Sequence, residues 1–517
     1  MKQEASERSL TQRIIGGMLW SAWGKGANTV LQMVIVGTLA RLLSPSDFGV
    51  VSAALVVIGV SSVLSHLGLG PALVQRPEIE PRHIATTFTA SVLFGVMLGV
   101  LVWCAAPAAA VFFQIPAVTP VVRALAWVFV IQGFGIAPEA LMKRELRFRW
   151  LATRDVVTYL LGYGAVGIPL AALGFGVWAL VAAQMAQTLA RTVALVSQHP
   201  PSLRGLGERR AFHELFYFGG GFTLAKVAQY IAGQGDNLVV GRFLGPAALG
   251  FYGRAFQFMA SPASDFGNIL DQVLFPAMAR VQDEPARLTA AYRRGVALVG
   301  LVVLPVSAAL VILAPEAILV LLGRAWTPVV APFQILAVGM LFRTSYMMSD
   351  SIARATGSVY RRAWRQGLYA ALVIGGAWIG QHWGIIGVAW AVLGAVTINF
   401  LMMAKLSLSV VRLTWAGLWR AHVPGLLVAA GSAPVVWIAA TLSRHWGLPP
   451  GAVVGGGAGV FICGVLLLVR LAPRVFLGRD GLWMLDALRS FAPKLFPARV
   501  YRTPDAQEGR VEPRPAA

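Results

Sequence analysis

Long apolar runs recur along the whole chain and constrain its fold more than any other feature. Each run has about 20 residues, the length that a helix needs to cross the hydrocarbon core of a bilayer. Only 13% of the 517 residues are charged, whereas a soluble chain carries about a quarter. No segment has the composition of a soluble domain. We therefore expect an all-α, polytopic integral membrane protein.

The runs and the polar breaks between them predict about fourteen transmembrane helices. The first run is too long for a cleaved signal peptide and lacks a cleavage site of small residues, so we expect it to remain as the first helix. The expected spans are 14–40, 48–74, 84–112, 118–140, 156–174, 176–198, 214–241, 248–277, 295–322, 329–353, 366–382, 384–404, 423–442 and 452–470.

Basic residues alternate between the loops on the two sides of these spans. The second, fourth and sixth loops carry several basic residues, as in 143–154. The intervening loops hold at most single arginines (Arg41, Arg242, Arg324 and Arg444), and 173–176 and 381–384 carry no Lys or Arg. Basic loops stay in the cytoplasm, so both termini are expected there. This rule also accounts for the net charge of +21. Nucleic acid is not an expected partner.

An internal repeat divides the chain. A shift of 201 positions places RLLSPSDFGV (41–50) on RFLGPAALGF (242–251) and Lys25 on Lys226. Two six-helix lobes related by an axis along the membrane normal are the expected result, with a cleft between them for alternating access. The expected divisions are an N-lobe at 1–198, a C-lobe at 199–409, two extra helices at 410–472 and a cytoplasmic tail at 473–517. Within this tail, residues 474–496 form a possible interfacial helix, with Leu482, Leu485, Leu488 and Phe491 near helical spacing.

Polar residues follow one face of several spans. In the first span, Ser21, Lys25, Asn28 and Gln32 fall at i, i+4, i+7 and i+11. A lysine at the bilayer centre costs about 2.5 to 3.5 kcal/mol, so such a face is expected to line the cleft. Equivalent lysines on opposing lobes favour a shared anion. The candidate residues for binding the substrate are Lys25, Lys226, Arg254, Arg343, Asn28, Gln32, Gln229 and Gln257, and those for possible ion coupling are Asp236, Asp265, Asp271 and Asp350.

Simple ion pairing is the alternative for these charges. Lys226 with Asp236, Arg254 with an acid of span eight, and Arg343 with Asp350 could each fix helix packing. For Arg41 and Arg242, which lie near the outer ends of their spans, snorkelling and helix termination are a sufficient explanation.

No catalytic or metal-binding pattern is found in the sequence. There is no P-loop, no metal-ligand cluster and no nucleophile with a base. Cys104 and Cys463 lie inside apolar runs, where a small hydrophobic role is expected and a disulfide is not. We expect a transporter without a cofactor.

Several segments carry a resemblance to a known family. Residues 16–75, with LSPSDFG at 43–49 and LGLGPALVQ at 67–75, and PEALMKRELRFRWLA at 138–152 resemble the Wzx-type polysaccharide flippases of the MOP superfamily, in the lipopolysaccharide and exopolysaccharide branch that includes the colanic acid exporter. The resemblance implies transfer of an undecaprenyl-diphosphate-linked oligosaccharide across the bacterial inner membrane to the periplasmic leaflet. Membrane lipids, a polysaccharide polymerase and export machinery are the partners that it implies.

Three other functions remain open at this stage. A flippase for the peptidoglycan precursor lipid would share the architecture. A multidrug or cation antiporter of the same superfamily would need an acidic, aromatic cavity, whereas this one is expected to be cationic. A membrane glycan polymerase or ligase would need a sizeable periplasmic loop, and the outer loops here are short.

Overall fold

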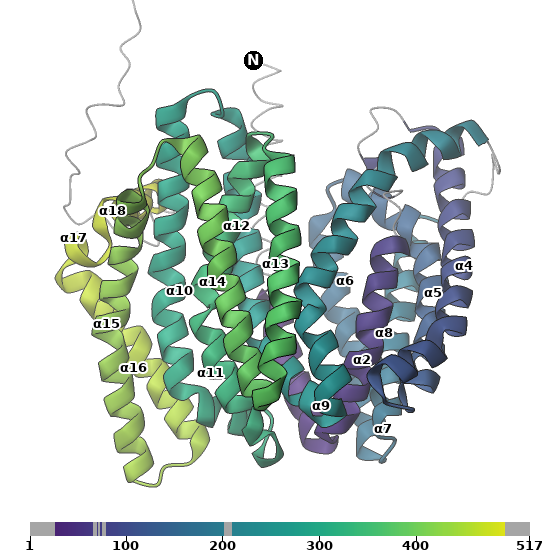
Figure 1. Cartoon of the computed structure of the whole chain (residues 1–517), viewed down its shortest axis with the longest axis horizontal. Coiled ribbons are helices and arrows are strands. Elements are labelled where there is room, and N and C mark those ends of the chain that lie inside the picture. Colours follow the sequence, from purple (N-terminus) through teal and green to yellow (C-terminus); the bar gives the residue numbers. More distant parts are fainter. Residues whose placement is uncertain (1–25, 66–69, 71–72, 75–78, 201–208, 492–517) are drawn as a thin grey trace, which may run out of the picture.

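The computed structural model describes residues 26–65, 70, 73–74, 79–200 and 209–491. This part of the chain is almost entirely helical and contains no strand. Long helices stand side by side in two groups, with α2 to α8 in one group and α10 to α18 in the other (Figure 1). The expected all-α fold is confirmed.

The first group contains the helices that precede residue 200. They pack on one another through the pairs α4 with α5, α5 with α8, and α2 with α5. The elements are a helix over 26–42, α2 (Pro45–Ser65), α4 (Pro81–Phe113), α5 (Val118–Arg144), α6 (Phe148–Tyr159), the π-helical segment η1 (Leu160–Gly167), α7 (Ile168–Ala172) and α8 (Val177–Gln198).

The second group follows and packs through the pairs α10 with α12, α12 with α14, and α13 with α14. α9 packs against helices of both groups. The elements are α9 (Arg209–Arg280), α10 (Pro285–Leu321), η2 (Arg324–Val329), α11 (Val330–Val338), α12 (Met340–Ala355), α13 (Val359–Gly380), η3 (Gln381–Trp383), α14 (Gly384–Val411), α15 (Trp415–His445), α16 (Pro450–Leu471), α17 (Pro473–Phe476) and α18 (Gly478–Phe491).

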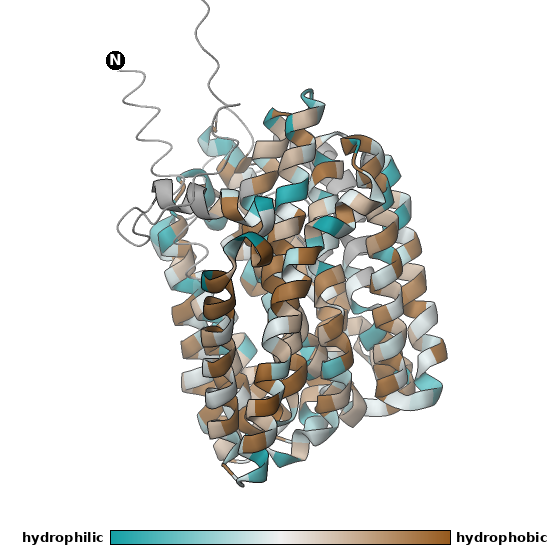
Figure 2. Ribbon diagram, turned by 90° about the vertical axis from the view of Figure 1, so that its left-hand side faces the viewer, coloured by the Kyte–Doolittle hydropathy of each residue, from teal (hydrophilic) through white to brown (hydrophobic). Residues whose placement is uncertain are grey.

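The protein crosses the membrane several times. Within the described residues, nine helices are long and apolar enough to span it, and the bent pair Arg324–Val338 and Met340–Ala355 would make a tenth. One of the nine, Tyr360–Val411, contains both α13 and α14. The expected number of fourteen is therefore not confirmed. Hydrophobic residues dominate the long helices on the side shown in Figure 2, and hydrophilic residues gather near both ends.

α9 is broken at the turn that the repeat predicts. Gly245 has a φ of 83°, a left-handed conformation inside a 72-residue helical stretch. Glycine adopts this conformation without steric cost, and Pro246 follows it. The break divides α9 into a first part, 209–244, and a second part, 246–280, which correspond to the expected spans 214–241 and 248–277.

The two repeats meet each other through equivalent residues. A side chain on Gly49 of α2 would overlap the carbonyl oxygen of Pro246, and a side chain on Gly250 would overlap the carbonyl oxygen of Pro45. Each pair is related to the other by the shift of 201 positions. Helix backbones can approach this closely only where a small residue faces the partner. We call the end of the molecule that holds these four residues the closed end.

Trp326 of η2 reinforces this contact. Its side chain is fully buried, with 0% exposure, and its Nε1–H donates to the carbonyl oxygen of Ala40 over 2.8 Å. Its ring makes edge contacts with Phe48 of α2 and Phe251 of α9 at centroid distances of 5.2 and 5.8 Å. Trp326 thus connects the helix 26–42 and α2 to α9 at the closed end.

The amphipathic segment near the C-terminus forms α18. Asp480 accepts a hydrogen bond from Arg293 of α10 over 3.0 Å, and the neighbouring Arg294 lies over the Trp483 ring at 3.8 Å. These contacts hold α18 against α10. A position on the inner membrane surface stays a prediction, because the apolar side chains from Leu485 onward lie outside the described residues.

Candidate functional site

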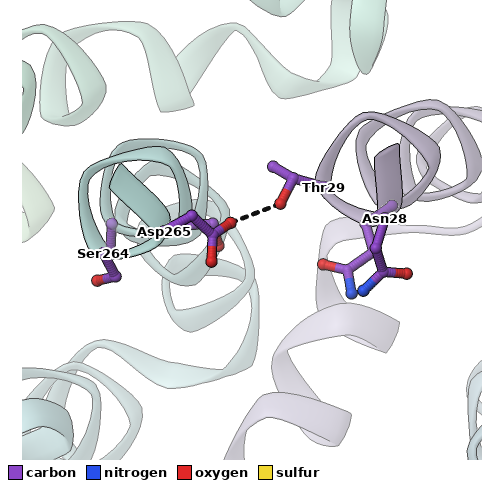
Figure 3. Close-up of a pocket in the computed structure, with 7 residues that line it drawn as sticks. Asn28, Thr29, Ser264 and Asp265 are labelled. Atoms are coloured by element: carbon purple, nitrogen blue, oxygen red, sulfur yellow. Dashed lines mark hydrogen bonds between the residues drawn. The ribbon is translucent and has the colours of Figure 1, made fainter. Parts of the chain in front are cut away.

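A polar cavity of about 270 Å³ lies between the helix 26–42 and the second part of α9. Thr29 and Asp265 point toward each other across it (Figure 3). The lining residues are Asn28, Thr29, Gln32, Ala260, Ser261, Ser264 and Asp265. A helix face with these side chains would be costly against lipid, and a hydrated cavity removes that cost.

One hydrogen bond crosses the cavity. The Thr29 hydroxyl donates to the Asp265 carboxylate over 2.6 Å. The Asn28 side-chain oxygen is buried and has no hydrogen-bond partner in the described part of the chain. A narrow extension of the cavity reaches Gln257 through Gln32. The polar stripes expected on the first and eighth spans therefore meet at one site.

Arg254 lies one side chain away from this cavity. Its guanidinium donates to the Gln257 side-chain oxygen and lies over the Phe48 ring at 5.0 Å. Its Nε is buried without a hydrogen-bond partner, and among the described residues no carboxylate lies within ion-pairing distance of it. The expected alternative, a pair between Arg254 and an acid of span eight, is not formed. An uncompensated cation beside a polar cavity can bind an anion.

Asp236 and Arg343 belong to a second buried cluster. Asp236 is 1% exposed and accepts hydrogen bonds from the Tyr252 hydroxyl at 2.7 Å and from the Asn237 backbone N–H at 2.9 Å. Arg343 is close enough to interact electrostatically with Asp236, and its guanidinium lies over the Phe256 ring at 5.1 Å. Neither residue lines the cavity.

Asp271 and Asp350 are engaged in ion pairs. Arg354 bridges them, with nitrogen to oxygen distances of 2.5 Å to Asp271 and 3.0 Å to Asp350. Arg362 of α13 binds Asp350 as well. The suggested pair of Arg343 with Asp350 is wrong. Asp350 instead binds Arg354, one turn further along α12, and Arg362 of α13.

We expect the exchange of Asp350 for asparagine to lower stability more than transport per molecule. Breaking a buried ion pair costs about 3 to 5 kcal/mol, and partial exposure here, 15% for Asp350, reduces this to roughly 2 kcal/mol. The melting temperature of the purified protein and the export per membrane-inserted copy are the measurements. Asp265→Asn is the matched control, since Asp265 has no ion pair among the described residues, and should show the reverse pattern. A stable Asp350→Asn protein that does not export would contradict a structural role.

Three candidate residues cannot be placed at side-chain level. Lys25 lies outside the described residues, one turn before Asn28, and the side chains of Lys226 and Gln229 are likewise outside them. Their roles stay predictions.

The structure also identifies residues that the sequence patterns missed. Thr29 is adjacent to the polar stripe of the first span, and Arg354 follows Asp350 at the i+4 spacing of a helical ion pair. The position of each residue relative to its neighbours in the sequence could therefore have identified it. Tyr252 carried no such signal, because it is an aromatic residue in an apolar run that becomes a hydrogen-bond donor only through its fold contact with Asp236.

A helical bundle that crosses the membrane several times and holds a polar cavity between its helices is typical of a membrane transporter. Residues 38–331 match the polysaccharide biosynthesis protein family. The chain belongs to this family, and the resemblance expected from its sequence is confirmed.

Two curated relatives extend over most of the chain. The teichuronic acid biosynthesis protein TuaB of Bacillus subtilis (strain 168) is 24% identical over 482 residues, which cover 90% of this chain and 97% of TuaB. The lipopolysaccharide biosynthesis protein WzxC of Escherichia coli (strain K12) is 26% identical over 415 residues, which cover 76% of this chain and 80% of WzxC.

Solved structures show the same fold. The lipid II flippase MurJ in an inward closed conformation matches with a TM-score of 0.68 at 12% identity, over 90% of this chain and 99% of MurJ. An inward-facing multidrug resistance transporter of the MATE family, in the MOP superfamily, matches with a TM-score of 0.61 at 16% identity, over 76% of this chain and 99% of that transporter. The MOP fold expected from the sequence is thereby confirmed.

Proposed function

We propose that the protein is a flippase that moves undecaprenyl-diphosphate-linked oligosaccharide repeat units from the cytoplasmic to the periplasmic leaflet of the bacterial inner membrane for the synthesis of a surface polysaccharide. Membership of the polysaccharide biosynthesis family supports the substrate class. TuaB and WzxC, which are named for the synthesis of cell-surface polymers, support it as well. The transfer breaks no covalent bond, so the proposed protein is a transporter and not an enzyme.

The polar cavity between the two repeats is the observation that carries this proposal. A diphosphate and a hydrophilic glycan cannot cross the hydrocarbon core unaided, because their polar groups would lose their hydrogen bonds. The cavity offers amide and hydroxyl groups from Asn28, Gln32 and Ser261 inside a membrane bundle. The head group would enter this cavity while the lipid chain remains in the bilayer.

The cations around the cavity would hold the diphosphate. Arg254 has no ion-pair partner among the described residues and reaches the cavity through Gln257. Lys25 and Lys226 would approach from equivalent positions of the two repeats. Arg343 lies further away, in the Asp236 cluster. A compact anion shared by both repeats would draw them together in the loaded state.

Alternating access would use the two repeats as moving bodies. We infer an N-lobe at 1–198 and a C-lobe at 199–409 that rock about the cavity, with both termini in the cytoplasm and the closed end facing the periplasm. The structure would then represent a state that is shut toward the periplasm. A polysaccharide polymerase and export machinery would take up the delivered unit.

Among the acids, Asp236 and Asp265 remain as candidates for ion coupling. Neither forms an ion pair with another described residue, unlike Asp271 and Asp350. A carboxylate that gains or loses a proton or Na⁺ in one state only would bias the equilibrium between states. Asp265 is the better placed for this role because it lies in the cavity itself.

Purified protein in liposomes should transfer a lipid-diphosphate oligosaccharide between leaflets and leave it chemically unchanged. The measurement combines the accessibility of the glycan to a lectin outside the vesicles with mass spectrometry of the recovered lipid. Liposomes without protein give the background rate. Chain extension, release of the carrier lipid, or no transfer above background would each refute the proposal.

A further inference from the structure

We propose that Arg41 and Arg242 form a reciprocal latch that holds the closed end shut. We use the term latch for the two contacts of these arginines with backbone carbonyl groups of the opposite helix group. The proposal rests on the alternating-access function above. It adds residues that control which state the protein occupies and that do not touch the substrate.

Each arginine reaches the end of a helix in the opposite group. Arg41 lies in the last turn of the helix 26–42, and its guanidinium donates to the carbonyl oxygen of Val320 in the last turn of α10. Arg242 precedes the break in α9, and its guanidinium donates over 3.5 Å to the carbonyl oxygen of Val111 in the last turn of α4. The last carbonyl groups of a helix form the negative end of its dipole, and a carbonyl oxygen can accept a second hydrogen bond, so a guanidinium is a favourable ligand.

The two arginines are equivalent under the internal repeat, and each binds a carbonyl group in the last turn of a helix, α10 for Arg41 and α4 for Arg242. Arg41 and Arg242 differ by the same 201 positions as Pro45 and Pro246. Each arginine belongs to one repeat, and the carbonyl group that it binds belongs to the other. Contacts of this kind break when the repeats separate at the closed end, whereas contacts within one repeat would survive. The latch can therefore stabilise only states in which this end is shut.

Neighbouring contacts place the latch inside the seal. Trp326 donates to the carbonyl oxygen of Ala40, the residue before Arg41. The crossing of α2 with α9 lies just after both arginines, at Gly49 and Gly250. None of these residues lines the cavity. The arginines would thus act on the state of the protein and not on its ligand.

These contacts add a further role to the snorkelling and helix termination expected from the sequence. A snorkelling arginine directs its charge to water or to lipid head groups. The guanidinium groups of Arg41 and Arg242 bind backbone carbonyl groups of the opposite repeat. The signal in the sequence was their equivalence under the repeat, whereas the carbonyl partners could come only from the structure.

Cysteine labelling from both sides of the membrane tests the latch. A cavity reporter, Ser261→Cys, is placed in a background in which Cys104 and Cys463, both free and exposed, are replaced by serine. An impermeant maleimide is applied to spheroplasts and to inside-out vesicles. The ratio of the two labelling rates reports which end is open. Arg324→Ala is the matched control, because Arg324 is an exposed arginine at the same end whose side chain forms no hydrogen bond or ion pair with another described residue.

We expect Arg41→Ala to raise the labelling rate from the side of the closed end about tenfold relative to the rate from the other side. The reason is the loss of one hydrogen bond to a charged group, which would otherwise stabilise the shut state. Arg242→Ala should have a smaller effect because its contact is longer, and the double variant should exceed either single variant. Arg41→Lys, which keeps the charge and one donor, should lie between wild type and Arg41→Ala and serves if the alanine variant accumulates poorly. Arg324→Ala should leave the ratio unchanged.

Equal ratios for Arg41→Ala, Arg41→Lys and Arg324→Ala would overturn the latch. So would a change in the opposite direction, toward the other end. The labelling ratio reports the accessibility of the cavity and requires no glycan. A failure of the liposome transfer experiment would therefore refute the proposed function without contradicting the latch. Conversely, transfer in liposomes with unchanged accessibility ratios would refute only the latch.

Discussion

Alanine in place of Lys25 or Lys226 is expected to reduce export about 10- to 100-fold, the loss that corresponds to one hydrogen bond to a charged group of 1.5 to 3 kcal/mol. Both lysines occupy equivalent positions of the repeat, and the polar cavity begins one turn further along the first helix, at Asn28. Surface polysaccharide per membrane-inserted copy is the measurement. The protein should still accumulate, since removal of a charge from the membrane interior relieves an insertion cost.

A double variant separates anion binding from ion pairing. If Lys226 only neutralises Asp236, then Lys226→Ala combined with Asp236→Asn should restore export. We expect no rescue, because Asp236 already accepts hydrogen bonds from Tyr252 and from the Asn237 backbone. Arginine at either lysine position should rescue partly, since it keeps the charge but presents a planar fork. Near-normal export from either alanine variant at equal abundance would contradict a shared anion.

Valine in place of Gly250 should abolish the closed end and with it at least nine tenths of export. The added side chain would overlap the backbone carbonyl oxygen of Pro45, which cannot move aside as a flexible side chain could. Forced overpacking costs up to about 3 kcal/mol, enough to shift a two-state equilibrium by roughly 100-fold. Gly49→Val should have the same effect, because its side chain would overlap the carbonyl oxygen of Pro246. Export per copy and the two-sided labelling of Ser261→Cys are the measurements.

The control for this experiment is a helical glycine without neighbours. Gly394 of α14 has no atom within 4 Å of the position of an added side chain, so Gly394→Val should leave export and labelling close to wild type. Valine has a higher intrinsic helix propensity than glycine, so helix formation itself is not impaired in any of the variants. Wild-type export from Gly49→Val and Gly250→Val would show that the crossing is dispensable.

The ion pairs of Asp350 show which contacts the spacing of residues along one helix can predict. The i+4 spacing of Asp350 and Arg354 is present in the sequence and is sufficient to predict their ion pair. The i+7 spacing of Arg343 and Asp350 also places two charges on one face, but two turns apart, and that pair does not form. Arg362 completes the site from another helix. A partner on a different helix depends on packing, which a single sequence pattern does not encode.

The cavity could also be predicted from residue spacing along single helices. Asn28 and Gln32 repeat with helical spacing on an otherwise apolar span, as do Gln257, Ser261 and Asp265. Polar faces within the membrane must avoid lipid, so each face predicts a polar neighbour. The hydrogen bond between Thr29 and Asp265 needed the structure, because it depends on the rotation and depth of one helix relative to the other.

The sequence by itself determined the class of the protein, the helical elements, the repeat and the faces that must be kept from lipid. These properties follow from the length and period of apolar runs and from the cost of exposing polar groups to hydrocarbon. Only the tertiary structure decided which charges pair, which end is closed and where Arg41 and Arg242 bind. The charge pairs join side chains on different helices, and the two arginines bind backbone atoms that are the same in every residue, so both depend on how the helices pack and not on a local pattern.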